Sequence, residues 1–445
     1  MEKLAYLIPL AACVYLLVSC WWVREYFRTE KLPKAAPTNT AQATVTGAPV
    51  GVAVTAEAPP PVSILKPVRG LDEGAYENFA SFFHQDYPEY EILFAVAEED
   101  DPAVPLIRHV IAEHPERPAR LLTEIPPLFP NPKVNSLARL TEEAAYSWLV
   151  ISDSDIRVRP SYLRQITAPL ADPQVGMVTC CYRGVAPRTL TAKLEALYMG
   201  VTFLPQVVVA RRFLAMHFAL GATIALRKAD LERIGGWGPV GDRLAEDTHL
   251  ARRIRAAGLE VVLSRYIADC YLGTTTWREQ WDREVRWART NRVNRPREYP
   301  GILLTLPLPL ALVLLPLDPR GAWGWSAIAG ALAVRWATAW LVTGFTDNRP
   351  LRRWLAWLPL RDCLSGLVWC AGLCGRKVVW RGTIHHLDRG GRLTTGPALA
   401  ALSLETSALT NGTASAHIGR GVDCDRSGPL LGRKGMKRKG SGREA

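Results

Sequence analysis

The pattern of apolar positions predicts a membrane helix at the start of the chain. Residues 4–23 form an apolar run without a charge, and its length is the roughly 20 residues that one helix needs to cross a bilayer. A cleaved signal peptide is the rival interpretation, but no small-x-small cleavage site follows the run. The run continues instead through two Trp into four basic residues, Arg24, Arg28, Lys31 and Lys34. We predict an uncleaved anchor over residues 1–30 whose C-terminal side lies in the cytoplasm.

The middle of the chain has the apolar pattern of an α/β domain. Residues 31–60 are rich in Ala, Pro and Thr without periodicity, which predicts an extended linker. From residue 61 to residue 299, β-branched apolar runs alternate with helical patterns. The predicted strands are residues 63–68, 91–97, 148–153 and 175–182, and the predicted amphipathic helices include residues 102–114 and 133–146. This alternation predicts one cytoplasmic α/β domain over residues 61–299, built on a mainly parallel sheet.

A second apolar region occupies residues 300–390. Two apolar runs, residues 301–317 and 322–345, predict a hairpin of two spanning helices. Arg335 lies near the middle of the second run, and we expect it to face protein because a charge is costly in lipid. Charges and a proline split residues 354–375 into pieces that are too short to span, which predicts a re-entrant or interfacial segment.

Charge and cysteine content change this picture little. The net charge of +12 raises the question of a nucleic-acid partner, but from residue 419 on eight basic residues face three acidic ones, so this short tail alone carries 8 − 3 = +5. We predict that residues 391–445 form a basic disordered tail attracted to anionic lipid, and we expect no nucleic-acid partner. The nine Cys show no Cys-x-x-Cys pair or zinc spacing, which is typical of reduced thiols in the cytosol.

Acidic residues follow two of the predicted strands, at the sheet edge where α/β folds bind ligands. Asp101 follows residues 91–97 and either contacts a nucleoside or caps the helix that begins near Pro102. Asp153 ends the predicted strand at residues 148–153, and Asp155 lies two residues further on in a turn. Two such carboxylates suit one Mg²⁺ or Mn²⁺ ion, although an isolated Asp-x-Asp is also common in solvated turns.

Two further elements carry candidate chemistry. Asp247 opens a predicted helix, where the helix dipole favours a carboxylate whatever its function, and where it can also serve as a general base. Arg283, Arg286 and Trp287 lie in a basic, aromatic stretch before the second apolar region. Their simplest interpretation is a helix at the membrane interface, but arginine forks also suit a diphosphate, and Trp offers a flat surface to a sugar or lipid.

Together these motifs occur in one order, which resembles the ceramide glucosyltransferase family. The resemblance runs from residue 63 to about residue 295. Within this family, the sequence at residues 221–227, 286–290 and 380–382 is most similar to the bacterial hopanoid-biosynthesis glycosyltransferases. The motifs that carry it are Ser63 to Pro67, Gln85 to Pro88, Asp101, Asn131 to Asn135, Asp153 to Val158, Glu246-Asp247 and Arg283-x-x-Arg286-Trp287.

The resemblance implies a GT-A fold, a UDP-sugar donor, a divalent cation (Mg²⁺ or Mn²⁺) and inversion at the anomeric carbon. It assigns Asp247 as the base, and Asp153 to the metal and the diphosphate, with Asp155 as a second metal ligand. The remaining residues that it assigns bind the donor or complete the site: Lys66, Pro67, Asp101, Lys133, Arg283, Arg286 and Trp287.

We therefore predict a multi-pass membrane glycosyltransferase, favoured in a bacterial inner membrane, that moves a sugar to a lipid hydroxyl. The favoured reaction transfers N-acetylglucosamine to a hopanoid polyol, and the alternative transfers glucose to ceramide. The lipid is expected to enter between the Trp287 stretch and the membrane hairpin. A processive polysaccharide synthase and a catalytically silent scaffold that binds nucleotide or lipid are the rival functions.

Overall fold

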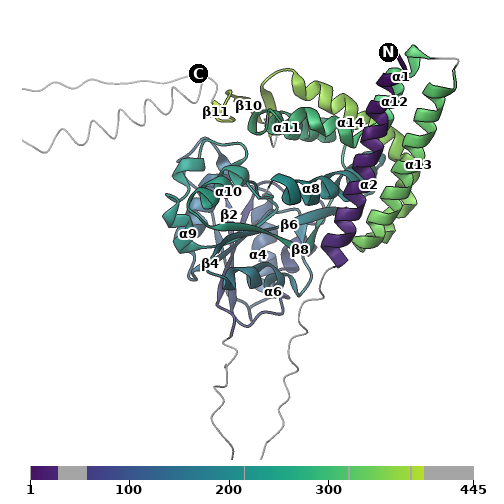
Figure 1. Ribbon diagram of the computed structural model, residues 1–445. Helices are drawn as coiled ribbons and strands as arrows, with labels where there is room; N and C mark the ends of the chain where they lie inside the picture. Colours follow the sequence, from purple (N-terminus) through teal and green to yellow (C-terminus); the bar gives the residue numbers. More distant parts are fainter. Residues whose placement is uncertain (1, 29–57, 215, 319–320, 381–382, 395–445) are drawn as a thin grey trace, which may run out of the picture. The chain divides into compact units, whose positions relative to one another are not determined.

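The computed structural model describes residues 2–28, 58–214, 216–318, 321–380 and 383–394 (Figure 1). Most of the predicted linker over residues 31–60 and of the predicted tail over residues 391–445 lies outside these residues. Residues 381–382 of the motif at 380–382 lie outside them as well.

The described residues contain an eight-stranded sheet in the order β3-β2-β1-β4-β7-β6-β8-β5. Strands β3, β2, β1 and β4 are parallel to one another, β6 is parallel to β8, and β7 and β5 run against their neighbours. The predicted mainly parallel α/β fold is therefore confirmed. The strands are β1 (Val62–Val68), β2 (Tyr90–Val96), β3 (Ala119–Leu122), β4 (Trp148–Ser152), β5 (Ile156–Arg157), β6 (Val175–Val185), β7 (Thr223–Arg227) and β8 (Glu260–Tyr271).

Helices cover both faces of this sheet, which explains why the central strands are continuous apolar runs. On β1, Ile64 belongs to one core cluster and its neighbour Leu65 to the other. The first cluster includes residues of α4 (Ala103–Glu113) and α6 (Tyr162–Thr167). The second includes residues of α5 (Pro132–Glu143) and α10 (Glu246–Ala256). Short elements complete the domain: α3 (Ala75–Ala80), η1 (Ala168–Ala171), α9 (Lys228–Arg233) and η3 (Gly238–Val240).

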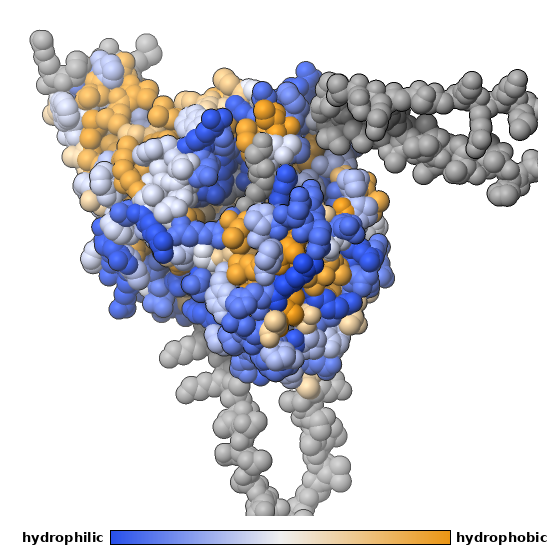
Figure 2. All heavy atoms as spheres, turned by 180° about the vertical axis from the view of Figure 1, so that it is seen from behind, coloured by the Kyte–Doolittle hydropathy of each residue, from blue (hydrophilic) through white to orange (hydrophobic). Residues whose placement is uncertain are grey.

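Two helices at the side of the sheet domain are long and apolar enough to cross a membrane (Figure 1). They are α2 (Leu7–Arg28), which follows the short α1 (Glu2–Ala5), and α13 (Ala322–Phe345). They pack against each other, and the Tyr26 hydroxyl of α2 donates to the Leu263 carbonyl of β8 at 2.6 Å. Figure 2 shows apolar side chains gathered on the outside of this helical region, as expected of a surface that faces lipid.

The apolar run at residues 301–317, which we predicted to be the first of two spanning helices, is bent in the structure. It forms η4 (Tyr299–Thr305), α12 (Pro307–Leu314) and η5 (Leu315–Leu317), with a bend of 87° between η4 and the following pair. Leu306 has a non-helical backbone at the bend, and the residue before a proline disfavours the helical region. Whether this bent pair crosses a membrane stays a prediction.

A further apolar segment, Leu190–Leu214, also has the length and composition of a membrane span, which the sequence analysis did not predict. It consists of α7 (Leu190–Tyr198), a π-helical turn η2 (Met199–Phe203) and α8 (Leu204–Leu214). Of its most apolar window, 72% is buried inside the protein, between the sheet and the other helices. Its apolar composition is therefore accounted for by burial in protein.

A layer of helices lies above this segment (Figure 1). The 18-residue α11 (Trp277–Asn294) begins with a capping box formed by Thr276 and Glu279, and it packs along α14 (Leu358–Leu373). At 16 residues, α14 is shorter than the roughly 20 residues of a spanning helix. The turn η6 (Arg349–Trp357) precedes α14, and a small sheet of β9 (Lys377–Trp380), β10 (Thr383–Leu387) and β11 (Leu393–Thr394) follows it.

Buried ion pairs join the apolar helices to the rest of the protein. Arg335 of α13 binds both carboxylate oxygens of Asp362 on α14, and its other nitrogens donate to the Val201 carbonyl and the Thr202 hydroxyl of η2. The Arg335 and Asp362 side chains are 2% and 0% exposed. Arg335 therefore faces protein, as expected from its place in an apolar helix.

Removing one partner of this pair should leave an uncompensated buried charge. We expect Arg335→Ala to destabilise the protein by about 3–5 kcal/mol, seen as a lower thermal unfolding midpoint of the full chain in detergent. The double variant Arg335→Met/Asp362→Leu should recover most of the loss. Arg353→Ala, which changes an exposed arginine on η6, is the control and should cost less than about 1 kcal/mol. Equal midpoints for Arg335→Ala and the control would contradict this account.

Candidate active site

The turn after β4 lies at the edge of the sheet where the parallel strands β1, β2 and β4 end. The Lys133 ammonium lies 2.7 Å from the Asp153 carboxylate, and the Lys66 ammonium donates to the Asp153 main-chain carbonyl at 2.9 Å. Two lysines from different elements therefore hold this turn. The Asp153 side chain is still 35% exposed, so its carboxylate remains accessible to a ligand.

Lys133 stands at the centre of the site. It lies in the first turn of α5, which Asn131 caps by accepting from the Lys133 and Val134 backbone N–H groups. Besides Asp153, its ammonium contacts the Glu246 carboxylate at 3.1 Å and donates to the Gly221 carbonyl at 3.2 Å. Burial lowers the pKa of Lys133, but the surrounding carboxylates outweigh burial and raise that pKa, so the lysine stays charged.

Asp247 opens α10 next to this lysine. Its two oxygens accept from the backbone N–H groups of Gly221 at 2.9 Å and Thr248 at 2.5 Å. Burial, followed by the neighbouring Glu246 carboxylate, raises the pKa of Asp247 to about 7. A carboxylate with a pKa near neutrality is well matched to accepting a proton at physiological pH.

Gly221 allows the backbone to approach this pair. A Cβ atom at this position would lie 3.2 Å from both the Asp247 carboxylate oxygen and the Lys133 ammonium. A side chain would therefore press on the two charged groups that define the site. Even an alanine here would require one of these two groups to move by a few tenths of an ångström.

Lys66 lies beneath the turn and is fully buried, with its ammonium 3.7 Å from the centre of the Phe82 ring. Burial lowers the pKa of Lys66 to about 7, and Asp153 and then Asp155 act in the opposite direction. The next residue, Pro67, is partly exposed and pairs with Ala95 of β2. Both residues lie at the carboxyl end of β1.

Asp101 makes two structural hydrogen bonds. One carboxylate oxygen accepts from the Ala103 N–H at the start of α4, and the other accepts from the Gly70 N–H, both at 2.8 Å. Gly70 has a φ of 70°, a backbone conformation that favours glycine. The helix-capping interpretation of Asp101 therefore describes its contacts, and its carboxylate also fixes the loop after β1.

Asp155 contacts a different set of residues from Asp153. Its carboxylate accepts from the Cys270 thiol at 3.5 Å, and its main-chain carbonyl accepts from the Tyr271 N–H. Burial, and after it the charges of Asp155 and Glu195, raises the pKa of the Cys270 thiol well above its usual value. Glu195 of α7 is completely buried and binds Arg283 of α11 at 2.6 Å. Arg283 is thereby brought near the Asp155 side of the turn.

The other two residues of the α11 motif occupy separate positions. The Trp287 ring stacks on Tyr198 of α7 with ring centres 6.3 Å apart, and the Arg286 guanidinium lies 5.9 Å from the Trp380 ring of β9. The site residues predicted from the sequence thus form one compact cluster of Lys66, Lys133, Asp153 and Asp247. Pro67 and Asp101 lie at neighbouring strand ends, and the α11 motif approaches from the other helical layer.

Sequence reasoning missed two residues of this site. Glu195 is a lone carboxylate in the apolar segment Leu190–Leu214, and a buried charge of that kind requires a partner, which was the available signal. Gly221 belongs to the family motif at residues 221–227, but no residue near it in the sequence indicated that its N–H would contact Asp247. Both contacts join segments that are far apart in sequence.

The residues present fit a divalent cation that uses phosphate oxygens. In the part of the chain that the structure describes, no group of three or more His, Cys, Asp or Glu side chains is placed to hold a metal ion. Mg²⁺ commonly takes only one or two protein carboxylates and completes its shell with substrate phosphates and water. Asp153, with its accessible carboxylate, and Asp155, two residues on, are a donor set of this type.

Known proteins of similar sequence or fold were found by three comparisons. The chain is 26% identical over 348 residues to "Ceramide glucosyltransferase 1" of Caenorhabditis elegans, a match that covers 76% of this chain and 73% of that protein. It is 23% identical to "Ceramide glucosyltransferase" of Pyricularia oryzae, covering 86% of this chain and 93% of that protein. Among solved structures, it is similar to a mannosyltransferase from Pyrobaculum calidifontis (TM-score 0.44, 19% identity, 83% of this chain and 99% of that chain).

A family model confirms the resemblance that the ordered motifs predicted. The model described as Glycosyl transferase family 21 matches residues 4–393, from the first apolar helix to the last described strand. The mainly parallel sheet agrees with the GT-A fold implied by that resemblance. Because the match takes in nearly the whole chain, the protein belongs to glycosyl transferase family 21 and is a membrane-associated hexosyltransferase.

Proposed function

We propose that this enzyme transfers glucose from UDP-glucose to the primary hydroxyl of a ceramide-type lipid, with inversion at the anomeric carbon. The observation that carries the proposal is the cluster in which Lys133 bridges Asp153 and Glu246 beside Asp247, in a chain of family 21. The curated relatives described above are named ceramide glucosyltransferases. These names favour the transfer of glucose to ceramide, which was the alternative. The short motifs at residues 221–227, 286–290 and 380–382 had favoured the transfer of N-acetylglucosamine to a hopanoid.

The donor is proposed to bind along the edge formed by the ends of β1, β2 and β4. Asp101 and the loop around Pro67 lie where the nucleoside would rest, and a diphosphate beside Asp153 would approach the Lys133 ammonium. Lys133 is shared between the Asp153 and Glu246 carboxylates. If a metal ion neutralised the Asp153 carboxylate, the Lys133 ammonium would be available to bind a phosphate group as well. The Lys66 ammonium supports the Asp153 turn by donating to the main-chain carbonyl of Asp153.

A Mg²⁺ or Mn²⁺ ion held by Asp153 with help from Asp155 would supply positive charge that neutralises the diphosphate. The protein's own positive groups act on the same charge. Lys133 is one of them, and Arg283, which Glu195 fixes in position, is proposed to be another. Arg286 and Trp287 are proposed to complete the site from α11.

Asp247 is proposed to act as the general base. It accepts the proton of the lipid hydroxyl while the hydroxyl oxygen forms a bond to the anomeric carbon. The bond from that carbon to the diphosphate oxygen breaks at the same time, and UDP leaves with the electron pair. The two backbone N–H groups on Asp247 fix its direction, and its raised pKa makes it a better proton acceptor than an ordinary aspartate.

The sheet domain is proposed to lie on the cytoplasmic side of the membrane, which the basic residues after the first apolar helix support. Arg24 and Arg28 follow the apolar part of α2, and cytoplasmic flanks of membrane helices are enriched in such charges. A multi-pass protein with a cytoplasmic catalytic domain is therefore the proposed arrangement, with a bacterial inner membrane as the proposed location.

The substrate assignment is tested with purified full-length protein in detergent. With UDP-glucose and ceramide we expect a product that carries one hexose, together with release of UDP. Chelation of divalent ions should lower the rate by about a hundredfold or more, and added Mn²⁺ should restore it, since a bound ion stabilises several kcal/mol of developing charge. A product formed only from UDP-N-acetylglucosamine and a hopanoid polyol would overturn the substrate assignment in favour of N-acetylglucosamine transfer to a hopanoid.

The role of Asp247 is tested by its pH dependence. Because only the ionised carboxylate accepts a proton, the wild-type transfer rate at saturating donor should fall as pH drops below about 7, the pKa of this group. Asp247→Asn should lower transfer by about a hundredfold or more while donor binding is retained. Asp172→Asn, at an exposed aspartate, is the control and should behave as wild type. Transfer retained in Asp247→Asn would remove this residue from the base role.

A further inference from the structure

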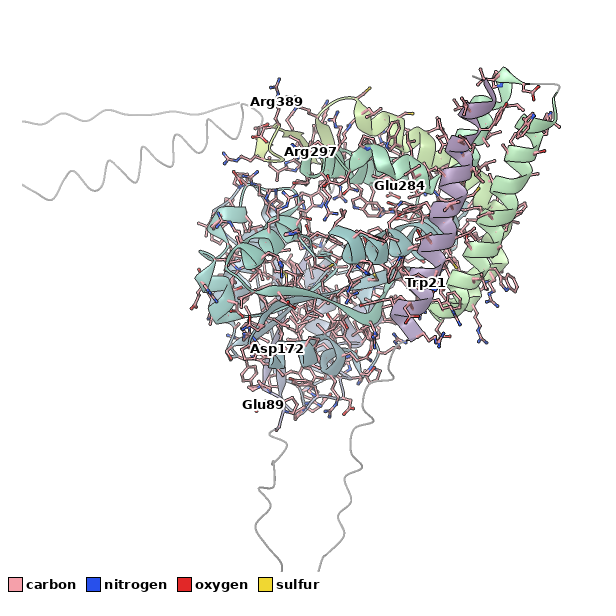
Figure 3. The ribbon with its side chains drawn as sticks, in the orientation of Figure 1. Trp21, Glu89, Asp172, Glu284, Arg297 and Arg389 are labelled. Atoms are coloured by element: carbon pink, nitrogen blue, oxygen red, sulfur yellow. The ribbon has the colours of Figure 1, made fainter. Side chains whose placement is uncertain are left out.

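A cavity lies between the catalytic helices and the membrane-side helices, apart from the Asp153 cluster. It is an open hollow, with room for the centres of water-sized molecules of about 60 Å³, and about 520 Å³ of space between atoms when the part open to solvent is counted. Its walls come from the segment α7 to α8, from α11, from η4 and from α14. On α11 the lining residues are Glu284, Trp287, Ala288 and Asn291, which form one face of the helix. Figure 3 labels Glu284 in this layer.

The two charged residues that line this cavity, Arg361 and Glu284, neutralise each other. Arg361 of α14 binds both carboxylate oxygens of Glu284 at 2.7 Å, and both side chains are almost completely buried. A fully paired arginine offers little attraction to a phosphate, because its forks are already occupied. The cavity is therefore unsuited to the anionic donor and suited to an uncharged ligand.

The remaining walls combine aromatic surface with neutral polar groups. The rings of Tyr299 and Trp369 stack with their centres 5.7 Å apart. The Tyr299 hydroxyl donates to the Trp369 main-chain carbonyl, and the Trp369 indole N–H donates to the Tyr299 main-chain carbonyl. These contacts make a rigid wall. Gln206 donates to Thr305, which leaves its amide oxygen as an acceptor, and Asn291 adds a second amide at the exposed rim. Such a lining suits a neutral amphiphile with hydroxyl and amide groups.

The cavity continues toward an exposed aromatic edge. A smaller hollow of about 190 Å³ shares Glu284 and Val368 with it and is also lined by Trp277 and Trp281 of α11. These two Trp side chains are 53% and 40% exposed. Exposed Trp residues on an interfacial helix are typical of the boundary between lipid and water. The two hollows thus lie next to each other along α11, one lined by Trp287 and the other by the exposed Trp277 and Trp281.

Trp287 belongs both to the wall of this cavity and to the α11 motif that is proposed to complete the active site. On the cavity wall its ring stacks on Tyr198 of α7. A head group held in the cavity would therefore contact a residue of the proposed active site.

From these observations we infer that the cavity binds the head region of the acceptor lipid, a neutral amphiphile of the ceramide class with hydroxyl and amide groups. The inference rests on the proposed function, because it supplies the acceptor for that reaction. Gln206 and Asn291 hydrogen-bond the amide and hydroxyl groups, and the hydrocarbon chains leave along the Trp277 and Trp281 edge.

The inference is tested by filling the cavity from its rim. Ile302 of η4 lines the cavity, whereas Leu304 of the same element does not and is 38% exposed. Ile302→Trp is the test variant and Leu304→Trp is its matched control, both in the full chain. The probe is a ceramide that carries a photoreactive group next to its amide, and labelled peptides are mapped by mass spectrometry.

We expect the probe to label cavity peptides in wild type and in Leu304→Trp, with loss of labelling when unmodified ceramide competes. In Ile302→Trp, labelling should fall about tenfold and the KM for ceramide should rise by a similar factor, with the KM for the donor unchanged. Asn291→Leu should raise the KM for ceramide in the same direction.

Equal labelling of Ile302→Trp and wild type, or wild-type labelling outside the cavity, would overturn the inference. Labelling and sugar transfer are measured separately, so the two proposals fail in different ways. Transfer without cavity labelling leaves the proposed function standing and removes the acceptor site. Cavity labelling without transfer leaves a lipid site and removes the proposed reaction.

Discussion

The ammonium of Lys133 is the constraint on which the proposed catalytic centre depends. It touches Asp153 at the end of β4 and Glu246 at the start of α10, and it lies beside Asp247. Without a positive charge at this point, carboxylates from separate elements would repel one another in a partly buried space. The cap that starts α5, the close approach of Gly221 and the position of α10 all serve to place these groups around one cation.

The second constraint is the set of buried ion pairs between helical layers. Arg361 ties α14 to Glu284 of α11, and Arg335 ties α13 to both α14 and η2. Because α11 also carries Arg283 and Trp287, these ion pairs fix the position of two residues that are proposed to complete the active site. Loss of one partner of such a buried pair is strongly destabilising. The apolar helices and the sheet domain are thus tied together, and the proposed acceptor cavity is lined by residues of α7 to α8, α11, η4 and α14.

Sequence patterns were sufficient for features that depend on neighbours along the chain. The strands were predictable because both faces of the sheet are covered, which made residues such as Ile64 and Leu65 apolar in succession. The Asp153 turn was predictable because it follows such a strand. The ion pair of Glu195 with Arg283 was not, since its partners are 88 residues apart. The bend before Pro307 was missed because composition alone measures apolar length and ignores backbone geometry.

The central claim is that the Asp153 turn and Lys133 together receive the metal and the diphosphate of the donor. Its most direct test is a crystal structure of the full chain with UDP-glucose and Mn²⁺, in which anomalous scattering locates the manganese. The account predicts one Mn²⁺ peak at the Asp153 carboxylate, adjoining the diphosphate, with Lys133 on the same phosphate group and no such peak in Asp153→Asn. A Mn²⁺ ion and diphosphate bound away from Asp153, or an unchanged peak in that variant, would contradict it.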